Sequence, residues 1–318
     1  MASQVGVSRT AQFWQITTPE GDHLLGGFPV SAVMSLIVGL TVPGIYVDLL
    51  DGTRLLAQPQ NTKKNEPSHL ILYRIRRNNI PALEQAGTIS DLNILADQNV
   101  AEETHIVFLS NNVIAVLFNQ DGPRISRLPE YLYRQFLIDI GVRPLLDPNT
   151  ARNLQNMGQI TSIELTIPVA SAALLPTSDS NADETLNALK LMAEKSLGRT
   201  LHVKTVLSTR ATSEGSQKWR ALIDTVVLSP MLALFRKLKV HAKSNVPGGP
   251  SLTIDFAEEQ LVLKVLVELT NESSRRAKPE SVRQALVDAH TKLAGTIATS
   301  VPTVTTVMAM SDLLRPDS

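Results

Sequence analysis

Arg283 and His290 are the best catalytic candidates in the sequence, because their residue types can supply a fixed positive charge and transfer a proton. They are seven residues apart, which is two helical turns, so both side chains share one face if residues 279–297 form a helix. Pro279 near the first turn predicts that helix. An arginine can stabilise phosphate charge, and a histidine can transfer a proton near neutral pH. The alternative is that His290 is an ordinary, partly exposed helical residue.

Glu103 and His105 form a second pair with catalytic potential. Two residues apart at the start of an apolar β-rich run, they would share one face of a strand, and Glu102 would point the other way. A carboxylate beside a histidine can raise the pKa of the imidazole and make an acid–base pair. The alternative is a surface neighbour or a hydrogen-bonded histidine without catalytic function.

Two clusters of arginines suggest a surface that binds phosphate. The first flanks the end of a predicted strand at 70–75, and the second follows a strand that stops at Asp121-Gly122-Pro123. If folding brings the clusters together, guanidinium groups would contact phosphate oxygens and a tyrosine would stack on bases. The alternative is solvated edge residues or partners for nearby acids. The predicted nucleic-acid-binding residues are Arg74, Arg76, Arg77, Arg124, Arg127 and Tyr131.

Composition excludes several kinds of chemistry. The chain has no cysteine, so thiolate nucleophiles, disulfides and iron–sulfur clusters are excluded. No glycine precedes a lysine, and the Gly-x-Ser-x-Gly and His-Glu-x-x-His motifs are absent. The six histidines are scattered, so we expect neither a metal site nor a cofactor. A formal net charge of zero argues against binding nucleic acid over the whole surface but leaves room for a local basic patch.

The elements that must position these residues indicate an α+β protein with mainly antiparallel sheets packed against helices. Asp51-Gly52 and Ser110-Asn111-Asn112 each predict a β-hairpin, because their residues tolerate positive φ. Three strands are predicted at 238–242, 252–256 and 261–269, ahead of the long helix. At 318 residues two domains are expected, and a shift in pattern near Met157-Gly158 divides them into 1–158 and 159–318.

The longest apolar stretch, 29–40, is much shorter than the roughly 20 residues needed to cross a bilayer. The sequence therefore predicts no membrane span, and the polar first ten residues lack the apolar core of a signal peptide. We expect a microbial cytoplasmic protein.

Three segments resemble uncharacterised bacterial proteins that are encoded near phage-defence genes. They are His69–Arg77, Glu102–Phe108 and Asn119–Arg124. The resemblance implies a defence role and supplies no catalytic residues.

The Arg-x6-His spacing of Arg283 and His290 is similar to that of HEPN ribonucleases, and Gln284 fits the polar position after the arginine. Those ribonucleases are all-helical bundles, whereas this helix follows three predicted strands.

The leading hypothesis is a non-enzymatic component of a bacterial anti-phage system that binds nucleic acid or a protein through an arginine-rich face. One alternative is a ribonuclease that uses Arg283 and His290. Another is an assembly subunit, in which an apolar strand such as 113–118 pairs at a sheet edge with another chain or a second copy.

Overall fold

The computed structural model describes residues 6–42, 44–49, 52–76, 83–85, 88–90, 98–147, 156–172, 181–195, 200–206, 237–245, 251–256, 260–271 and 276–314, together with 150, 153, 175, 219–220, 223, 226 and 235. Within these residues the strands form an eight-stranded sheet, a four-stranded sheet and one short hairpin. Every pairing between these strands is antiparallel, and helices pack on both larger sheets. The chain is a mixed α+β protein with mainly antiparallel sheets, which confirms the predicted fold class.

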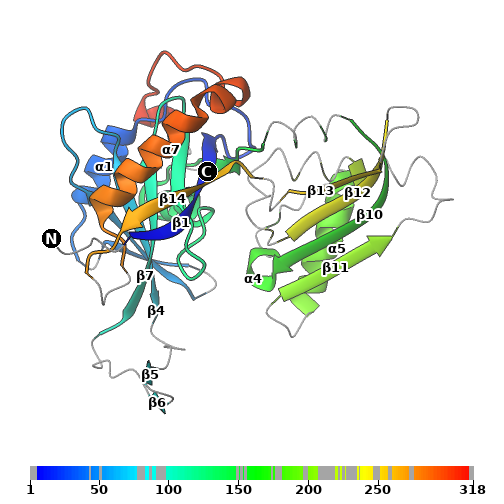
Figure 1. The fold of residues 1–318 in the computed structure, drawn as a ribbon, viewed down its shortest axis with the longest axis horizontal. Helices are drawn as coiled ribbons and strands as arrows, with labels where there is room; N and C mark the ends of the chain where they lie inside the picture. Colours follow the sequence, from blue (N-terminus) through cyan, green and yellow to red (C-terminus); the bar gives the residue numbers. More distant parts are fainter. Residues whose placement is uncertain are drawn as a thin grey trace.

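The larger sheet has the strand order β14-β1-β8-β7-β4-β3-β2, and β9 pairs with β1 beside this path (Figure 1). Two of its strands, β4 and β7, run beyond the others, towards the short hairpin of β5 and β6. The bounds are β1 Gly6–Thr17, β2 Tyr46–Asp48, β3 Arg54–Gln60, β4 His69–Arg76, β5 Leu83–Gln85, β6 Thr88–Ser90, β7 Val100–Phe108, β8 Val113–Leu117, β9 Gly141–Pro144 and β14 Val262–Glu268.

Helices cover both faces of the larger sheet because its central strands bury side chains on both sides. Helices α1 (Val30–Val38) and α2 (Arg127–Phe136) pack on one face, where Leu70, Leu72 and Ile106 are buried. Helix α7 (Pro279–Ser300) packs on the other face, against residues such as Phe13, Val107 and Ala115. Residues 301–314, which include a 3₁₀ turn at Met310–Leu313, then run as a docked segment beside the hairpin of β7 and β8.

The smaller sheet has the order β11-β10-β12-β13 and buries one face under α5. Alternate residues of its longest strand, among them Ile163 and Leu165, pack with Leu186 and Leu189 of that helix. The bounds are β10 Met157–Pro168, α4 Val169–Ala172, α5 Asn181–Lys195, β11 Thr200–Val206, β12 Lys237–Ser244 and β13 Ser251–Asp255.

The sheets do not follow the expected division into 1–158 and 159–318. The smaller sheet does begin near residue 158, but it ends with β13. Strand β14 then pairs with β1 over seven residues, from Gly6↔Glu268 to Gln12↔Val262. The last of the three predicted consecutive strands therefore belongs to the larger sheet, and α7 covers that sheet. Sequence patterns indicate where strands lie but not which strands pair. The sequence therefore could not predict that the chain returns to the larger sheet to pair β14 with β1.

The expectation that residues 113–118 form an exposed sheet edge is wrong. Strand β8 lies inside the sheet, paired with β1 on one side and with β7 on the other. All five of its residues are buried, which explains their uninterrupted apolar run. Among the described strands, the main path of the larger sheet ends at β14 and at β2.

Both predicted hairpins are present. Strands β2 and β3 are joined through Gly52, whose φ is +78°, while Asp51 lies outside the described residues. Strands β7 and β8 are joined through Asn111 and Asn112, with φ values of 58° and 60°. The Asn112 amide also clamps a distant segment: Oδ1 accepts from the Phe28 N–H at 2.6 Å, and Nδ2 donates to the Gly26 carbonyl at 2.9 Å.

We predict that Asn112→Ala lowers the free energy of unfolding by about 4 kcal/mol, because two buried backbone groups lose their partners and alanine is strained at positive φ. Asn111→Ala is the matched control, since it shares the backbone strain but removes, among the described residues, a single side-chain bond, the one from the Val304 N–H. Urea unfolding would measure both variants. An equal destabilisation in the two variants would contradict the role of the Asn112 clamp.

Candidate functional site

Two arginines of β4 share one glutamate of β7. Arg74 lies directly opposite Glu102, and Arg76 follows two residues later on the same face of the sheet. Arg76 Nη2 is 2.9 Å from Glu102 Oε1, and Arg74 contacts Oε2 through both Nε and Nη2. The glutamate side chain is 13% exposed and the arginine side chains are 30% and 28% exposed. The carboxylate therefore lies beneath two outward guanidinium groups.

Helix α2 repeats this arrangement with residues one turn apart. Glu130 lies between Arg127 and Arg134, at positions i+3 and i−4 relative to them. The distances are 2.6 Å from Arg127 Nη1 to Glu130 Oε2 and 3.6 Å from Arg134 Nε to Glu130 Oε1. Again one carboxylate is shared by two guanidinium groups.

Contacts along the chain join the two arrangements. On β7, Thr104 lies two residues from Glu102 on the same face, and its hydroxyl donates to the Pro123 carbonyl at 2.8 Å. Arg124 follows, with its guanidinium 5.3 Å from the centre of the Phe118 ring. The Arg127 N–H then donates to the Arg124 carbonyl at 2.9 Å. These contacts lead from β7, two residues after Glu102, to the first turn of α2, which carries Arg127.

We call these residues the arginine face: Arg74, Arg76, Arg124, Arg127 and Arg134, with Glu102 and Glu130. Its five guanidinium groups outnumber the two carboxylates that four of them share. The shared carboxylates fix Arg74, Arg76, Arg127 and Arg134 in place, and the Arg124 guanidinium lies over the Phe118 ring. An arginine held in this way loses less conformational freedom when it binds an anion.

Four of the six predicted site residues belong to the arginine face, namely Arg74, Arg76, Arg124 and Arg127. Arg77 lies outside the described residues. Sequence reasoning did not assign a role to Glu102. The signal that could have found it is the register of β4 against β7, which places Glu102 directly opposite Arg74.

The stacking role expected for Tyr131 is incorrect. Its ring is 0% exposed because α2 turns it towards the core beside Leu128 and Leu132. Its hydroxyl donates to the Ile45 carbonyl at 3.4 Å, and burial raises the pKa of Tyr131 to about 12. The Tyr131 side chain therefore cannot reach a base.

A buried polar network lies on the opposite face of the same strands. His69 Nε2 and His105 Nδ1 are 3.0 Å apart, and His105 Nε2 is 3.3 Å from Glu103 Oε1. The latter contact is electrostatic, because the His105 Nε2 atom has no hydrogen-bond partner of good geometry among the described residues. Glu103 also accepts from Arg276 Nε at 2.8 Å, and Arg276 Nη2 donates to the Tyr73 hydroxyl at 2.8 Å.

Burial sets the protonation of this network. It lowers the pKa of His69 to about 3, and the nearby His105 and Arg283 act in the same direction. Burial alone raises the pKa of Glu103, but contacts with His105 and Arg276 outweigh it, so that pKa is lowered. His69 is therefore neutral and Glu103 is ionised near pH 7.

Glu103 and His105 do share a strand face, as the sequence predicts. However, His69 and His105 are each only 2% exposed. An acid–base catalyst must come within hydrogen-bonding reach of a substrate. Because these imidazoles are sealed between the sheet and the segment that carries Arg276 and Arg283, the network is better suited to holding the fold together than to catalysis.

Arg283 and His290 lie on α7, as predicted, but they are engaged by different partners. Arg283 is ion-paired with Glu66, and its side chain is 13% exposed. The His290 ring lies 6.5 Å from the Phe13 ring, and burial lowers its pKa. The surrounding fold also differs from the all-helical HEPN bundle, because α7 covers a β-sheet. The geometry gives the ribonuclease hypothesis no support.

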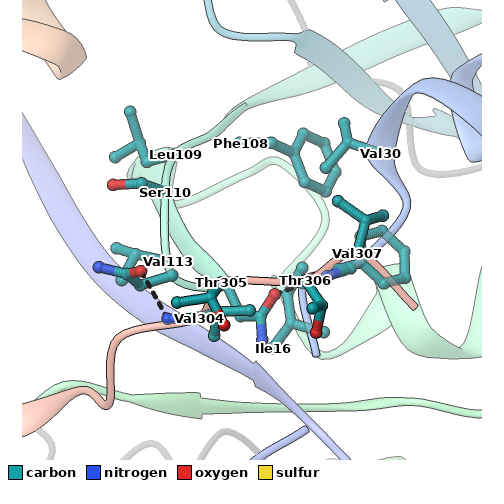
Figure 2. Close-up of a pocket in the computed structure, with 14 residues that line it drawn as sticks. Ile16, Val30, Phe108, Leu109, Ser110, Val113, Val304, Thr305, Thr306 and Val307 are labelled. Atoms are coloured by element: carbon teal, nitrogen blue, oxygen red, sulfur yellow. Dashed lines mark hydrogen bonds between the residues drawn. The ribbon is translucent and has the colours of Figure 1, made fainter. Parts of the chain in front are cut away.

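A cavity of about 250 Å³ lies where residues 304–307 pass the hairpin of β7 and β8 (Figure 2). Ile16, Val30, Phe108 and Val113 form much of its wall. The dashed line in Figure 2 marks the bond from the Val304 N–H to Asn111 Oδ1, at 3.0 Å. The Asn112 amide is already used by Gly26 and Phe28. Polar and apolar atoms thus line the cavity in about equal measure, and both of its asparagines are engaged in holding the chain.

In the described part of the chain, no group of three or more histidine, aspartate or glutamate side chains is arranged to hold a metal ion. Among those same residues, no helix combines the length and apolar character required to cross a membrane. Comparisons with protein-family models and with curated proteins gave no match to this chain.

The buried network predicts acid sensitivity. His69 has a pKa near 6.5 when unfolded and about 3 when folded, so the unfolded state takes up the proton first and stability falls as the pH drops below 6.5. Between pH 7 and pH 5 this one residue accounts for a decrease of about 2 kcal/mol in the free energy of unfolding.

Urea unfolding of His69→Gln at both pH values would measure that contribution. We expect the pH dependence to become shallower by about 2 kcal/mol, whatever the variant costs at pH 7. The control is His202→Gln, which removes an exposed histidine of the smaller sheet and should leave the pH dependence unchanged. Unfolding of His69→Gln with the full wild-type pH dependence would show that His69 does not carry the acid sensitivity.

Proposed function

We propose that the protein binds nucleic acid through the arginine face. The observation that carries the proposal is the sharing of each largely buried carboxylate by two arginines, Glu102 by Arg74 and Arg76 and Glu130 by Arg127 and Arg134. The arrangement supplies positive charge that is held in place and that exceeds the charge of the two shared carboxylates. Guanidinium groups match phosphate oxygens in geometry as well as charge.

The chemistry of the face favours contact with the phosphate backbone over reading of bases. Its cationic groups are all guanidinium groups, and the expected stacking tyrosine, Tyr131, is buried. Phosphate contacts position a protein on nucleic acid without specifying sequence. We therefore propose binding that depends steeply on salt and weakly on sequence. The neutral whole chain is consistent with a local contact, since attraction over the entire surface is absent.

A role for this binding in bacterial anti-phage defence rests on the resemblance of three segments alone, and it stays a prediction. Plaque counts on bacteria with and without the gene would test it. Equal counts across a broad phage panel would remove the defence role and leave the binding proposal untouched.

The sharpest binding test removes one arginine from each shared arrangement together with Arg124. In Arg76→Ala/Arg124→Ala/Arg134→Ala, Glu102 and Glu130 keep Arg74 and Arg127 as partners, so neither carboxylate is left unpaired. We expect affinity for a short DNA duplex to fall at least about tenfold near physiological salt. The slope of log K against log salt should fall by about 0.9 for each phosphate that the variant no longer neutralises.

The matched control removes the same charge at exposed sites elsewhere, in Arg9→Ala/Lys243→Ala/Lys292→Ala. This variant should retain most of the affinity and most of the salt dependence. The wild-type protein should bind a duplex of scrambled sequence as tightly as the original duplex. An equal drop in affinity for the two variants would show that net charge, and not the arginine face, governs binding. No binding of wild-type protein to duplex or single strand at low salt would reject the function.

A further inference from the structure

The edge strand β14 carries an unpaired set of backbone groups. In an antiparallel strand the N–H and C=O of one residue point to the same side, and the side alternates along the strand. At Glu268 these groups point away from β1, because its N–H donates to Ser281 Oγ and its carbonyl accepts from the Lys278 N–H. By alternation, the backbone groups of Val262, Lys264 and Leu266 also point outwards. In the described residues, these outward groups have no partner.

The side chains of the same three residues are exposed on one face. They alternate with Leu263, Val265 and Val267, which pack under α7. Leu266 is 69% exposed and Val262 is 42% exposed, which is unusual for aliphatic side chains at an open sheet edge. Lys264 lies between them, and its ammonium donates to Thr10 Oγ1 at 2.7 Å without any ion pair among the described residues. The edge thus presents an apolar–cationic–apolar pattern.

We propose that β14 is a docking edge for an extended segment of another protein, which pairs with it as an additional strand. Strand addition of this kind takes its affinity from main-chain hydrogen bonds and its specificity from alternate side chains. The segment would carry an acidic residue opposite Lys264, with an apolar residue two positions away on each side, opposite Val262 and Leu266. This pattern reads the same in both directions, so it holds for either strand orientation.

The charge at Lys264 also decides against a second copy of this chain as the occupant. Antiparallel self-pairing that opposes Val262 to Leu266 places Lys264 against Lys264 at the centre of the interface. Like charges directly opposite each other destabilise a strand pair. Shifting the register in one direction brings in Glu268, whose backbone groups are already bonded, and shifting it in the other brings in Gln260, which already forms a bridge with Leu146. The edge therefore fits an acidic partner better than its own copy.

The test uses the full chain and two fluorescent, end-capped peptides. The first is Thr-Thr-Val-Thr-Glu-Thr-Leu-Thr-Thr, and the second has lysine in place of the glutamate. We expect the acidic peptide to bind at least about tenfold more tightly than the basic one. Lys264→Glu should reverse that preference, and since this side chain is exposed, the variant should keep the thermal midpoint of the wild type.

Hydrogen exchange gives an independent readout of the same contact. On saturation with the acidic peptide, exchange should slow at the outward amides of Val262, Lys264 and Leu266. The amides of Leu263 and Val265 already face β1, so their exchange should not change.

Three results would each overturn the proposal: absence of binding by the acidic peptide, a preference unaffected by Lys264→Glu, or exchange that stays fast at the three outward amides. In those cases Lys264 serves only to keep the edge solvated.

Discussion

The pairing of β1 with β14 is the interaction on which the rest of the structure depends. Strand β1 also pairs with β8 and β9, so it ties the beginning of the chain to its middle and, through β14, to residues 262–268. Because the chain returns here, α7 covers one face of the larger sheet and residues 276–283 reach β4 and β7. Arg276 then contacts Glu103 and Tyr73, and Arg283 contacts Glu66. The same pairing makes β14 a sheet edge.

Two adjacent glutamates of β7 show how the sheet separates charge into two environments. Glu102 points to the face of α1 and α2, where two arginines share its carboxylate near the surface. Glu103 points to the face of α7, where it contacts His105 and Arg276 beside imidazoles sealed from solvent. The first environment holds more arginines than carboxylates near the surface, which suits it to an anion. The second balances its charges internally, which suits it to stabilising the fold near neutral pH.

Local features of the fold were predictable from sequence, whereas distant partners were not. The hairpins at Gly52 and at Asn111-Asn112 were predictable because positive φ restricts which residues can turn the chain. The shared face of Glu103 and His105 was predictable from the two-residue period of a strand. The pairing of β14 with β1 was not, because the alternation of 262–268 fits an edge of either sheet. Tyr131 was misassigned because it lies three residues after Leu128, and Leu132 lies four residues after Leu128, so all three belong to the stripe of α2 that faces the core.

The central claim is that carboxylates hold a set of arginines ready for phosphate, and the arginine Nε–H resonances report on it directly. Titration of the protein with a short DNA duplex should shift the signals of Arg74, Arg76, Arg124, Arg127 and Arg134 together, with a common affinity. The signal of Arg143, held by Gln15 on another strand, should not move. Shifts spread over all arginines, or confined to residues outside the arginine face, would contradict that claim.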